Sequence, residues 1–182
     1  GAIAPAALAG FAASLLGAWA VTVVDPSMLR KALPVILVAV LVYTLYKKQL
    51  GQTHEPRYSG RAEAWVACAI GASIGFYDGF FGPGAGSFFV FLFVRWLGYD
   101  FLNASASAKI LNLATNIAAL ILFTAKGHVW WHFAIPLAIA NVVGSMLGTW
   151  MALKKGSGFV RGMFIVVVSA LILKTGYDAF LR

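Results

Sequence analysis

Four polar side chains share one face of an otherwise apolar stretch, residues 104–124. They are Ser105, Lys109, Asn112 and Asn116, and at 100° per residue of an α-helix they fall within an arc of about 60°. An asparagine amide can donate a hydrogen bond to an oxyanion without carrying charge, and a lysine supplies the opposite charge. The spacing therefore predicts a binding face for a small anionic substrate. Two alternatives stand beside it: the asparagines only bond to neighbouring helices, or the Lys109 side chain extends to a polar surface.

A glycine-rich break in the stretch GFYDGFFGPGAGSFFVF, residues 75–91, is the second candidate. Gly82, Gly84 and Gly86 surround Pro83, and together these residues interrupt a helix. A helix that resumes after the break would present unpaired N–H groups and the positive end of its dipole, an arrangement that binds anions. The string lacks a preceding strand and a Gly-Lys-Ser/Thr ending, so it is neither a dinucleotide fingerprint nor a P-loop. The alternative is a structural kink whose backbone groups bond to neighbouring helices.

An aspartate and a row of glycines precede the break. Asp78 is expected to pair with Lys109 or to cap local N–H groups, in preference to titrating in a proton-coupled cycle. Gly71, Gly75 and Gly79 recur at every fourth position. This spacing predicts a helix face without side chains that packs closely against another helix.

The composition places these features in a membrane. Of the 182 residues, 61% are hydrophobic and 11% are charged, and the mean hydropathy is +0.85. A soluble domain is about half apolar and about a quarter charged. The net charge of +8 comes mostly from Lys and Arg between apolar blocks, as in the loops of membrane proteins. We therefore expect the lipid bilayer, and no nucleic acid, as a partner.

The residue types needed for an enzyme or a metal site do not come together in the sequence. Cys68 is the single cysteine, so neither a disulfide framework nor a cysteine-based metal site is available. His128 and His132 flank the segment VWW without a carboxylate nearby. Neither a Ser/His/Asp arrangement nor a pair of carboxylates is visible. We expect no enzymatic activity, no cofactor and no metal.

Apolar blocks divide the chain, and each is close to or above the roughly 20 residues that cross a membrane. The one long polar stretch, residues 47–63, combines proline, glycine and charge and predicts a loop. The expected apolar segments are residues 3–24, 28–46, 64–97, 104–124, 129–153 and 159–179. The expected fold class is an all-α polytopic membrane protein.

An internal repeat relates two pairs of these segments. PAALAGFAASLLGAW from Pro5 aligns without gaps with PLAIANVVGSMLGTW from Pro136, at an offset of 131 residues. The matches at this offset are Pro5/Pro136, Ala9/Ala140, Ser14/Ser145, Leu16/Leu147, Gly17/Gly148, Trp19/Trp150 and Arg30/Arg161. The predicted organisation is residues 1–46 as the later half of a first repeat, 47–63 as a linker loop and 64–182 as a second repeat. The same logic predicts about 65 to 75 residues upstream, with a second glycine break.

The segment 64–97 is too long for one straight span. Its 34 residues would form a helix of about 51 Å, against about 30 Å of hydrocarbon. If the break turns the chain back as a re-entrant hairpin, eight Lys and Arg residues lie on one face of the membrane and at most five on the other. A single crossing leaves six against six or seven, without bias. The charges favour the hairpin, which would make the two repeats inverted.

The string IGFYDGFFGPGAGSFF followed by ASAKILNLATNIAALILF resembles the second-half signature of the sulfite exporter TauE/SafE family of bacterial membrane transporters, in particular its YfcA-like branch. The resemblance covers the whole chain. It implies a multispanning inner-membrane protein with duplicated halves that moves small anionic sulfur compounds such as sulfite or sulfonates. The corresponding motif positions are Asp78, Gly82, Gly84, Gly86, Ser87, Lys109, Asn112 and Asn116, to which the helix face adds Ser105.

The expected function is a secondary exporter of such anions. The alternatives are a structural or assembly membrane protein, in which glycines and asparagines only pack helices, and a passive anion channel. The expected partners are the anion, the bilayer and the upstream half-repeat, and oligomer formation is compatible with the sequence.

Overall fold

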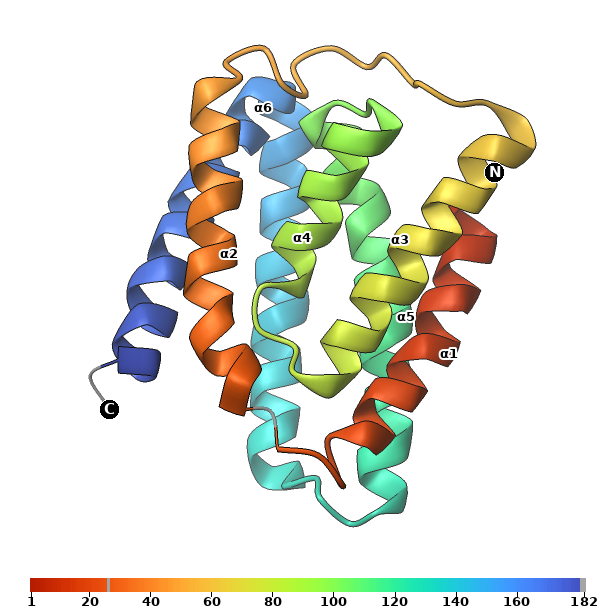
Figure 1. Ribbon diagram of the computed structural model, residues 1–182, viewed down its shortest axis with the longest axis vertical. Helices are drawn as coiled ribbons and strands as arrows, with labels where there is room; N and C mark the ends of the chain where they lie inside the picture. Colours follow the sequence, from red (N-terminus) through yellow and green to blue (C-terminus); the bar gives the residue numbers. More distant parts are fainter. Residues whose placement is uncertain (26, 181–182) are drawn as a thin grey trace.

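The computed structural model describes residues 1–25 and 27–180, and these residues form helices and connections without a strand. Figure 1 shows their arrangement as a bundle. The elements in chain order are α1 (Ile3–Ala20), α2 (Ser27–Tyr46), α3 (Gly60–Phe80), α4 (Ala85–Leu92), the π-helical turn η1 (Phe93–Leu97), α5 (Phe101–Ala125) and α6 (Trp131–Phe180). The expected all-α membrane fold is confirmed.

Helix α6 consists of two limbs that meet at a sharp kink. Gly156 has φ +76° and ψ −171°, which is not helical and which a residue with a side chain rarely adopts. The limb 131–155 runs up the bundle in Figure 1 and the limb 157–180 runs back down. The limbs correspond to the predicted segments 129–153 and 159–179, so the connection between them is shorter than expected.

The long segment 64–97 is a hairpin, as the charges favoured. Helix α3 runs down the bundle, the chain turns at residues 81–84, and α4 with η1 returns toward the end where α3 began (Figure 1). The connection 47–59 marks that end, because Glu55 N donates to Gly98 O at 3.0 Å and Phe101 N donates to Gly51 O at 2.8 Å. The start of α3 and the end of η1 therefore lie at the same end of the bundle.

The directions of the helices bear on the predicted duplication. Helix α1 and the limb 131–155 of α6, which carry the two copies of the proline-to-tryptophan motif, run in opposite directions in Figure 1. Opposite directions are what an inverted repeat requires. The duplication itself stays a prediction.

Close packing of α1 on α3 follows from small residues on both helices. A Cβ atom added to Gly75 would lie 2.6 Å from Gly10 O, and one added to Gly71 or Gly79 would meet the backbone of Ala6 or Ser14 closer than 3.0 Å. A side chain at any of these positions would push the helices apart. The glycine row is the packing face that its spacing predicted.

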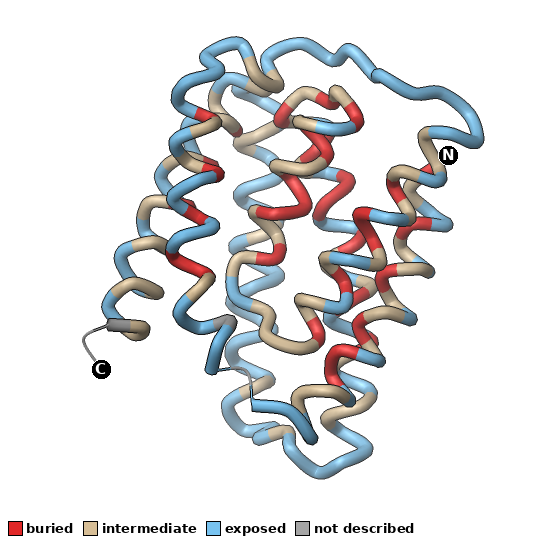
Figure 2. The backbone as a smooth tube through the Cα atoms, in the orientation of Figure 1, coloured by how far each residue is buried: buried red, intermediate tan, exposed pale blue. Residues whose placement is uncertain are grey.

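The buried core surrounds the returning arm of the hairpin. Phe89, Phe93 and Leu97 on this arm are fully buried, together with Phe101 and Leu111 of α5. Figure 2 shows the buried residues gathered on α4 and on the inner sides of α3 and α5, whereas the limb 131–155 is almost wholly exposed. Within the part of the chain that the structure describes, three helices are long and apolar enough to cross a membrane, Ile3–Ala20, Phe101–Ala125 and the kinked Trp131–Ala179, so exposed apolar side chains suit a lipid environment.

Candidate functional site

The break between the hairpin arms is a tight turn made possible by two glycines. Gly82 and Gly84 have φ values of +88° and +82°, in the left-handed region. Ala85 N donates to Gly82 O at 3.1 Å, but among the described residues the N–H groups of Gly86 and Ser87 donate to no backbone acceptor. The first turn of α4 therefore presents free donors at the positive end of the helix.

Space for a ligand exists on the same part of the chain. A Cβ atom added to Gly86 would meet nothing within 4 Å. A cavity of about 530 Å³ opens at the tip of the hairpin, between α2, the second limb of α6 and the break; it is lined by Arg30, Leu33, Phe81, Pro83, Thr175 and Asp178. Arg30 brings a permanent positive charge to this cavity. It is not among the predicted site residues, although its match to Arg161 in the repeat was a signal that could have selected it.

Asp78 lies beside the break and contacts α5. A Cβ atom added to Gly82 would be 3.8 Å from Asp78 Oδ1. Its other oxygen, Oδ2, lies within hydrogen-bond distance of Thr115 Oγ1 and 3.4 Å from Asn112 Nδ2. The structure thus joins Asp78 to one of the two predicted asparagines and adds Thr115, which sequence reasoning missed.

A second hydrogen-bond layer holds this cluster in place. The buried Ser14 of α1 donates to Thr115 O at 2.9 Å. Asn116 Nδ2 donates to Asn112 O at 2.7 Å and to Asn112 Oδ1 at 3.0 Å. The cluster therefore spans α1, α3 and α5, and its asparagines bond to each other as well as to Asp78.

Lys109 points away from Asp78. Its Nζ donates to Ser145 O at 3.2 Å, to Ser145 Oγ at 3.1 Å and to Thr149 Oγ1, all on the first limb of α6. The expected pairing with Asp78 is therefore not observed, and the ammonium group is bonded to α6 instead. The reason is geometric, because Lys109 and Asn112 stand at opposite edges of the 60° arc and face different helices. Ser105 lies on the same face and is half-buried.

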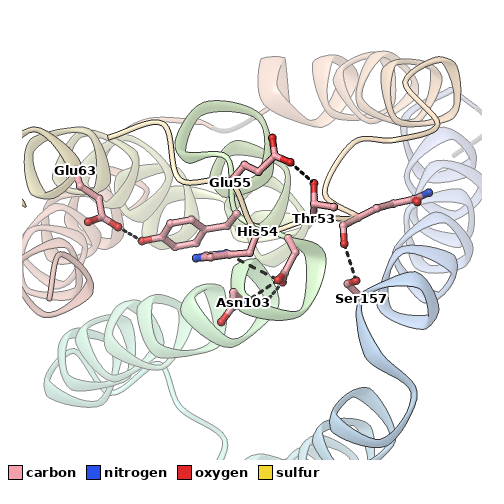
Figure 3. Close-up of polar contacts among 9 residues, drawn as sticks. Thr53, His54, Glu55, Glu63, Asn103 and Ser157 are labelled. Carbon is pink, nitrogen blue, oxygen red and sulfur yellow. Dashed lines mark hydrogen bonds and ion pairs between the residues drawn. The ribbon is translucent and has the colours of Figure 1, made fainter. Parts of the chain in front are cut away.

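The opposite end of the bundle carries polar contacts of a different kind (Figure 3). His54 Nδ1 lies 3.8 Å from Asp100 Oδ2, Ser157 Oγ donates to Gln52 O at 3.1 Å, and the Tyr99 hydroxyl donates to Glu63. The first two contacts tie the connection 47–59 to the start of α5 and to α6, and the third ties α3 to Tyr99, just before α5. No group of three or more metal-ligating side chains occurs within residues 1–25 and 27–180.

Comparison with known proteins finds relatives that are named as membrane transporters. The chain is 35% identical over 170 residues to "Probable membrane transporter protein YfcA" of Escherichia coli (strain K12), which covers 93% of this chain and 62% of that protein. It is 33% identical over 171 residues to "Probable membrane transporter protein ORF9" of Sinorhizobium sp, covering 93% of this chain and 64% of the relative. It is 31% identical over 168 residues to "Probable membrane transporter protein" of Haemophilus influenzae, covering 92% and 65%.

The chain thus spans less than two thirds of the length of these relatives. No solved structure matches it. Residues 1–175 match the family described as "Sulfite exporter TauE/SafE". The matched range includes the broken hairpin and the polar face of α5. The chain belongs to the sulfite exporter TauE/SafE family.

Proposed function

We propose that this chain is part of a secondary transporter for small anionic sulfur compounds such as sulfite or organosulfonates, and that it resides as a multi-pass protein in the cell inner membrane. The observation that carries the proposal is the first turn of α4, where the N–H groups of Gly86 and Ser87 have no backbone acceptor within the described part of the chain and the preceding break, through Phe81 and Pro83, lines an open cavity. The family description and the names of the relatives support transport. The face with the connection 47–59 is expected to be cytoplasmic, because the hairpin arrangement gathers more Lys and Arg there.

The chemistry of the break suits a sulfur oxyanion. Sulfite and sulfonate groups present three oxygens, which can accept from several converging donors at once. Backbone N–H groups at a helix start supply such donors together with a positive dipole end. Arg30 lines the cavity that leads to the break and adds a full positive charge, so an anion is favoured over a neutral molecule of the same size.

The polar face of α5 completes the proposed site. Asn116 carries an exposed amide next to Asn112, and Lys109 places an ammonium group between α5 and the first limb of α6. Helix-to-helix contacts of this kind can change when one group of helices moves against another, which is how many secondary transporters expose a site to each side in turn. We therefore assign Lys109 to the coupling of α5 with α6 as well as to the charge of the site.

The test is flux through the full-length protein in liposomes. Wild-type protein is expected to carry sulfite or ethanesulfonate with saturating kinetics and to carry chloride poorly. Lys109→Ala should lower flux by roughly tenfold or more, because it removes a charged hydrogen-bonding group worth about 1.5–3 kcal/mol. Asn116→Ala should lower flux by about two- to tenfold, because it removes a neutral one worth about 0.5–1.5 kcal/mol. Lys126→Ala and Asn141→Ala are matched controls at exposed positions and should retain wild-type flux.

Each alternative has its own result. Flux that does not saturate would indicate a passive channel. Loss of folded protein in both site variants, with no flux of any anion in the wild type, would indicate a structural or assembly protein. Wild-type flux in both site variants would refute the site assignment.

A further inference from the structure

The carboxyl group of Asp78 is a charge-bearing group inside the bundle that the anion site does not need. From α5 it receives one hydroxyl and one amide contact, but the one ion pair among the described residues joins His54 and Asp100. A carboxylate without a cation at this depth is costly, and such groups in membrane proteins commonly carry protons.

The hydrogen bonds of Thr115 reveal how a proton is accommodated. Thr115 Oγ1 lies within hydrogen-bond distance of Asp78 Oδ2 and also 3.0 Å from Asn112 O. A hydroxyl has one hydrogen, so it can donate to only one of these two acceptors. If it donates to Asp78, Oδ2 needs no hydrogen of its own, so the arrangement suits the ionised carboxylate. If it donates to Asn112 O, the contact with Asp78 needs a hydrogen from the carboxyl group itself.

The same heavy-atom positions therefore serve both protonation states of Asp78. The change needs one rotation of the Thr115 hydroxyl, and Ser14 fixes the Thr115 backbone while this happens. Asn112 O also accepts from Asn116, so it remains bonded in both states.

Other titratable groups near Asp78 are already engaged or lie further along the cavity. Helices α1 and α4 contribute no titratable side chain. The Tyr77 hydroxyl donates to Pro83 O, the Lys109 ammonium binds α6, and Arg95 of η1 lies over the Tyr43 ring. Arg30 and Asp178 line the cavity beyond Phe81 and Pro83.

We infer that Asp78 is the proton-binding residue of the transporter, and that the anion binds at the α4 turn together with a proton on Asp78. The inference rests on the proposed anion transport. An ionised Asp78 beside the break repels an anion at the α4 turn, whereas a neutral one does not. By linkage, anion binding favours protonation to the same extent that protonation favours anion binding.

The proton balance of the cycle is simple. One proton leaves the water on one side of the membrane and binds Asp78 Oδ2, and it leaves to water on the other side after the site has changed its exposure. No other bond forms or breaks. A monovalent sulfonate and this proton move as an electrically neutral pair, and a substrate that accumulates inside a cell leaves down its own gradient.

The experiment uses ethanesulfonate, the anion of a strong acid, because sulfite itself titrates near neutral pH. With full-length protein we expect ethanesulfonate to bind more tightly at lower pH, by a factor on the order of ten. An imposed pH gradient should speed its movement in the direction of the proton. Adding ethanesulfonate to weakly buffered wild-type protein should also remove protons from solution, a measurement that needs no variant.

Asp78→Asn keeps the shape of the side chain and mimics its neutral form. This variant should bind ethanesulfonate at every pH as the wild type does at low pH, take up no protons and ignore the pH gradient. Asp25→Asn, at an exposed carboxylate in the loop after α1, is the control that should retain the wild-type activity and pH dependence. Asp178→Asn tests the carboxylate that lines the cavity, and the pH dependence should persist in this variant whatever its affinity.

Three results would overturn the inference. They are a wild type that takes up no protons, an Asp78→Asn variant with wild-type pH dependence, and loss of that dependence in Asp178→Asn instead. In all three the protein still moves ethanesulfonate, so the proposed function survives. A wild type that carries neither ethanesulfonate nor sulfite at any pH would remove both proposals together.

Discussion

Replacing Gly17 by alanine tests the contact between α1 and the descending arm of the hairpin. A Cβ atom at Gly17 would lie 2.8 Å from Phe80 N and closer than 3.0 Å to Phe76 O, both of them backbone atoms of α3. An ordinary contact needs about 3.4 Å. The helices must therefore separate by about 0.6 Å to relieve the contact with nitrogen alone, and by more to relieve the contact with oxygen.

The expected magnitude follows from two opposing terms. Overpacking a well-packed contact costs about 1–3 kcal/mol, and alanine recovers up to about 1 kcal/mol through its better helix propensity. Gly148 occupies the matching position of the motif on the first limb of α6, where an added Cβ meets nothing within 4 Å. Gly148→Ala should thus be neutral or stabilising by up to about 1 kcal/mol.

Thermal unfolding of the two purified variants in one detergent measures this difference. A gap of about 1–3 kcal/mol corresponds to roughly 3–10 °C in Tm for a chain of this size, with Gly17→Ala the lower. Near-ultraviolet circular dichroism confirms that both variants start from the same fold. Equal Tm values for the two variants would show that the α1–α3 contact is not as close as described, and the account of the glycine row would have to be given up.

Two further predictions concern the opposite end of the bundle. Asp100→Ala removes the cap of α5, in which Asp100 Oδ1 accepts from Asn103 N at 2.7 Å, and should lower the free energy of unfolding by about 1 kcal/mol in denaturant titrations, whereas Asp100→Asn should recover most of it. Burial and the neighbouring Glu63 raise the pKa of Tyr99 above its ordinary value of 10.0. Because the folded state disfavours the ionised phenol, this contribution to stability is present below about pH 10 and is lost as the pH rises above it. Tyr99→Phe should therefore flatten the fall in Tm at alkaline pH, and an unchanged slope would mean that Tyr99 is not responsible.

The hairpin could be predicted from the sequence because length and charge agree on it. A helix over 64–97 exceeds the membrane thickness, and only one way of folding it gives an asymmetric distribution of Lys and Arg. The glycine row was predictable for a similar reason, since a four-residue spacing of residues without side chains has few uses other than close packing. Both predictions use only the length of a segment, the positions of its charges and the spacing of its glycines, all of which can be read from the sequence without knowing how the helices pack.

The partners of the polar residues could not be predicted in the same way. Lys109 and Asn112 share a 60° arc, yet one bonds to α6 and the other lies against Asp78 of α3, because a helix with neighbours on several sides offers different partners across a small rotation. Thr115 stands about 60° beyond Asn112, well outside the arc, and a threonine in an apolar helix commonly bonds its own backbone. Its contact with Asp78 depends on how α3 and α5 cross, which no spacing within one helix specifies.

The cavity at the hairpin tip has an electrical consequence. If water fills this space when the protein lies in a membrane, the potential of the bulk solution reaches close to the break, and the voltage then falls mainly between the break and the connection 47–59. A lone monovalent anion crossing that part of the bundle exchanges up to about 2.3 kcal/mol with a potential of 100 mV. On the proposed mechanism, an anion accompanied by a proton on Asp78 exchanges none, so the membrane voltage would neither drive nor oppose its passage through that part of the bundle.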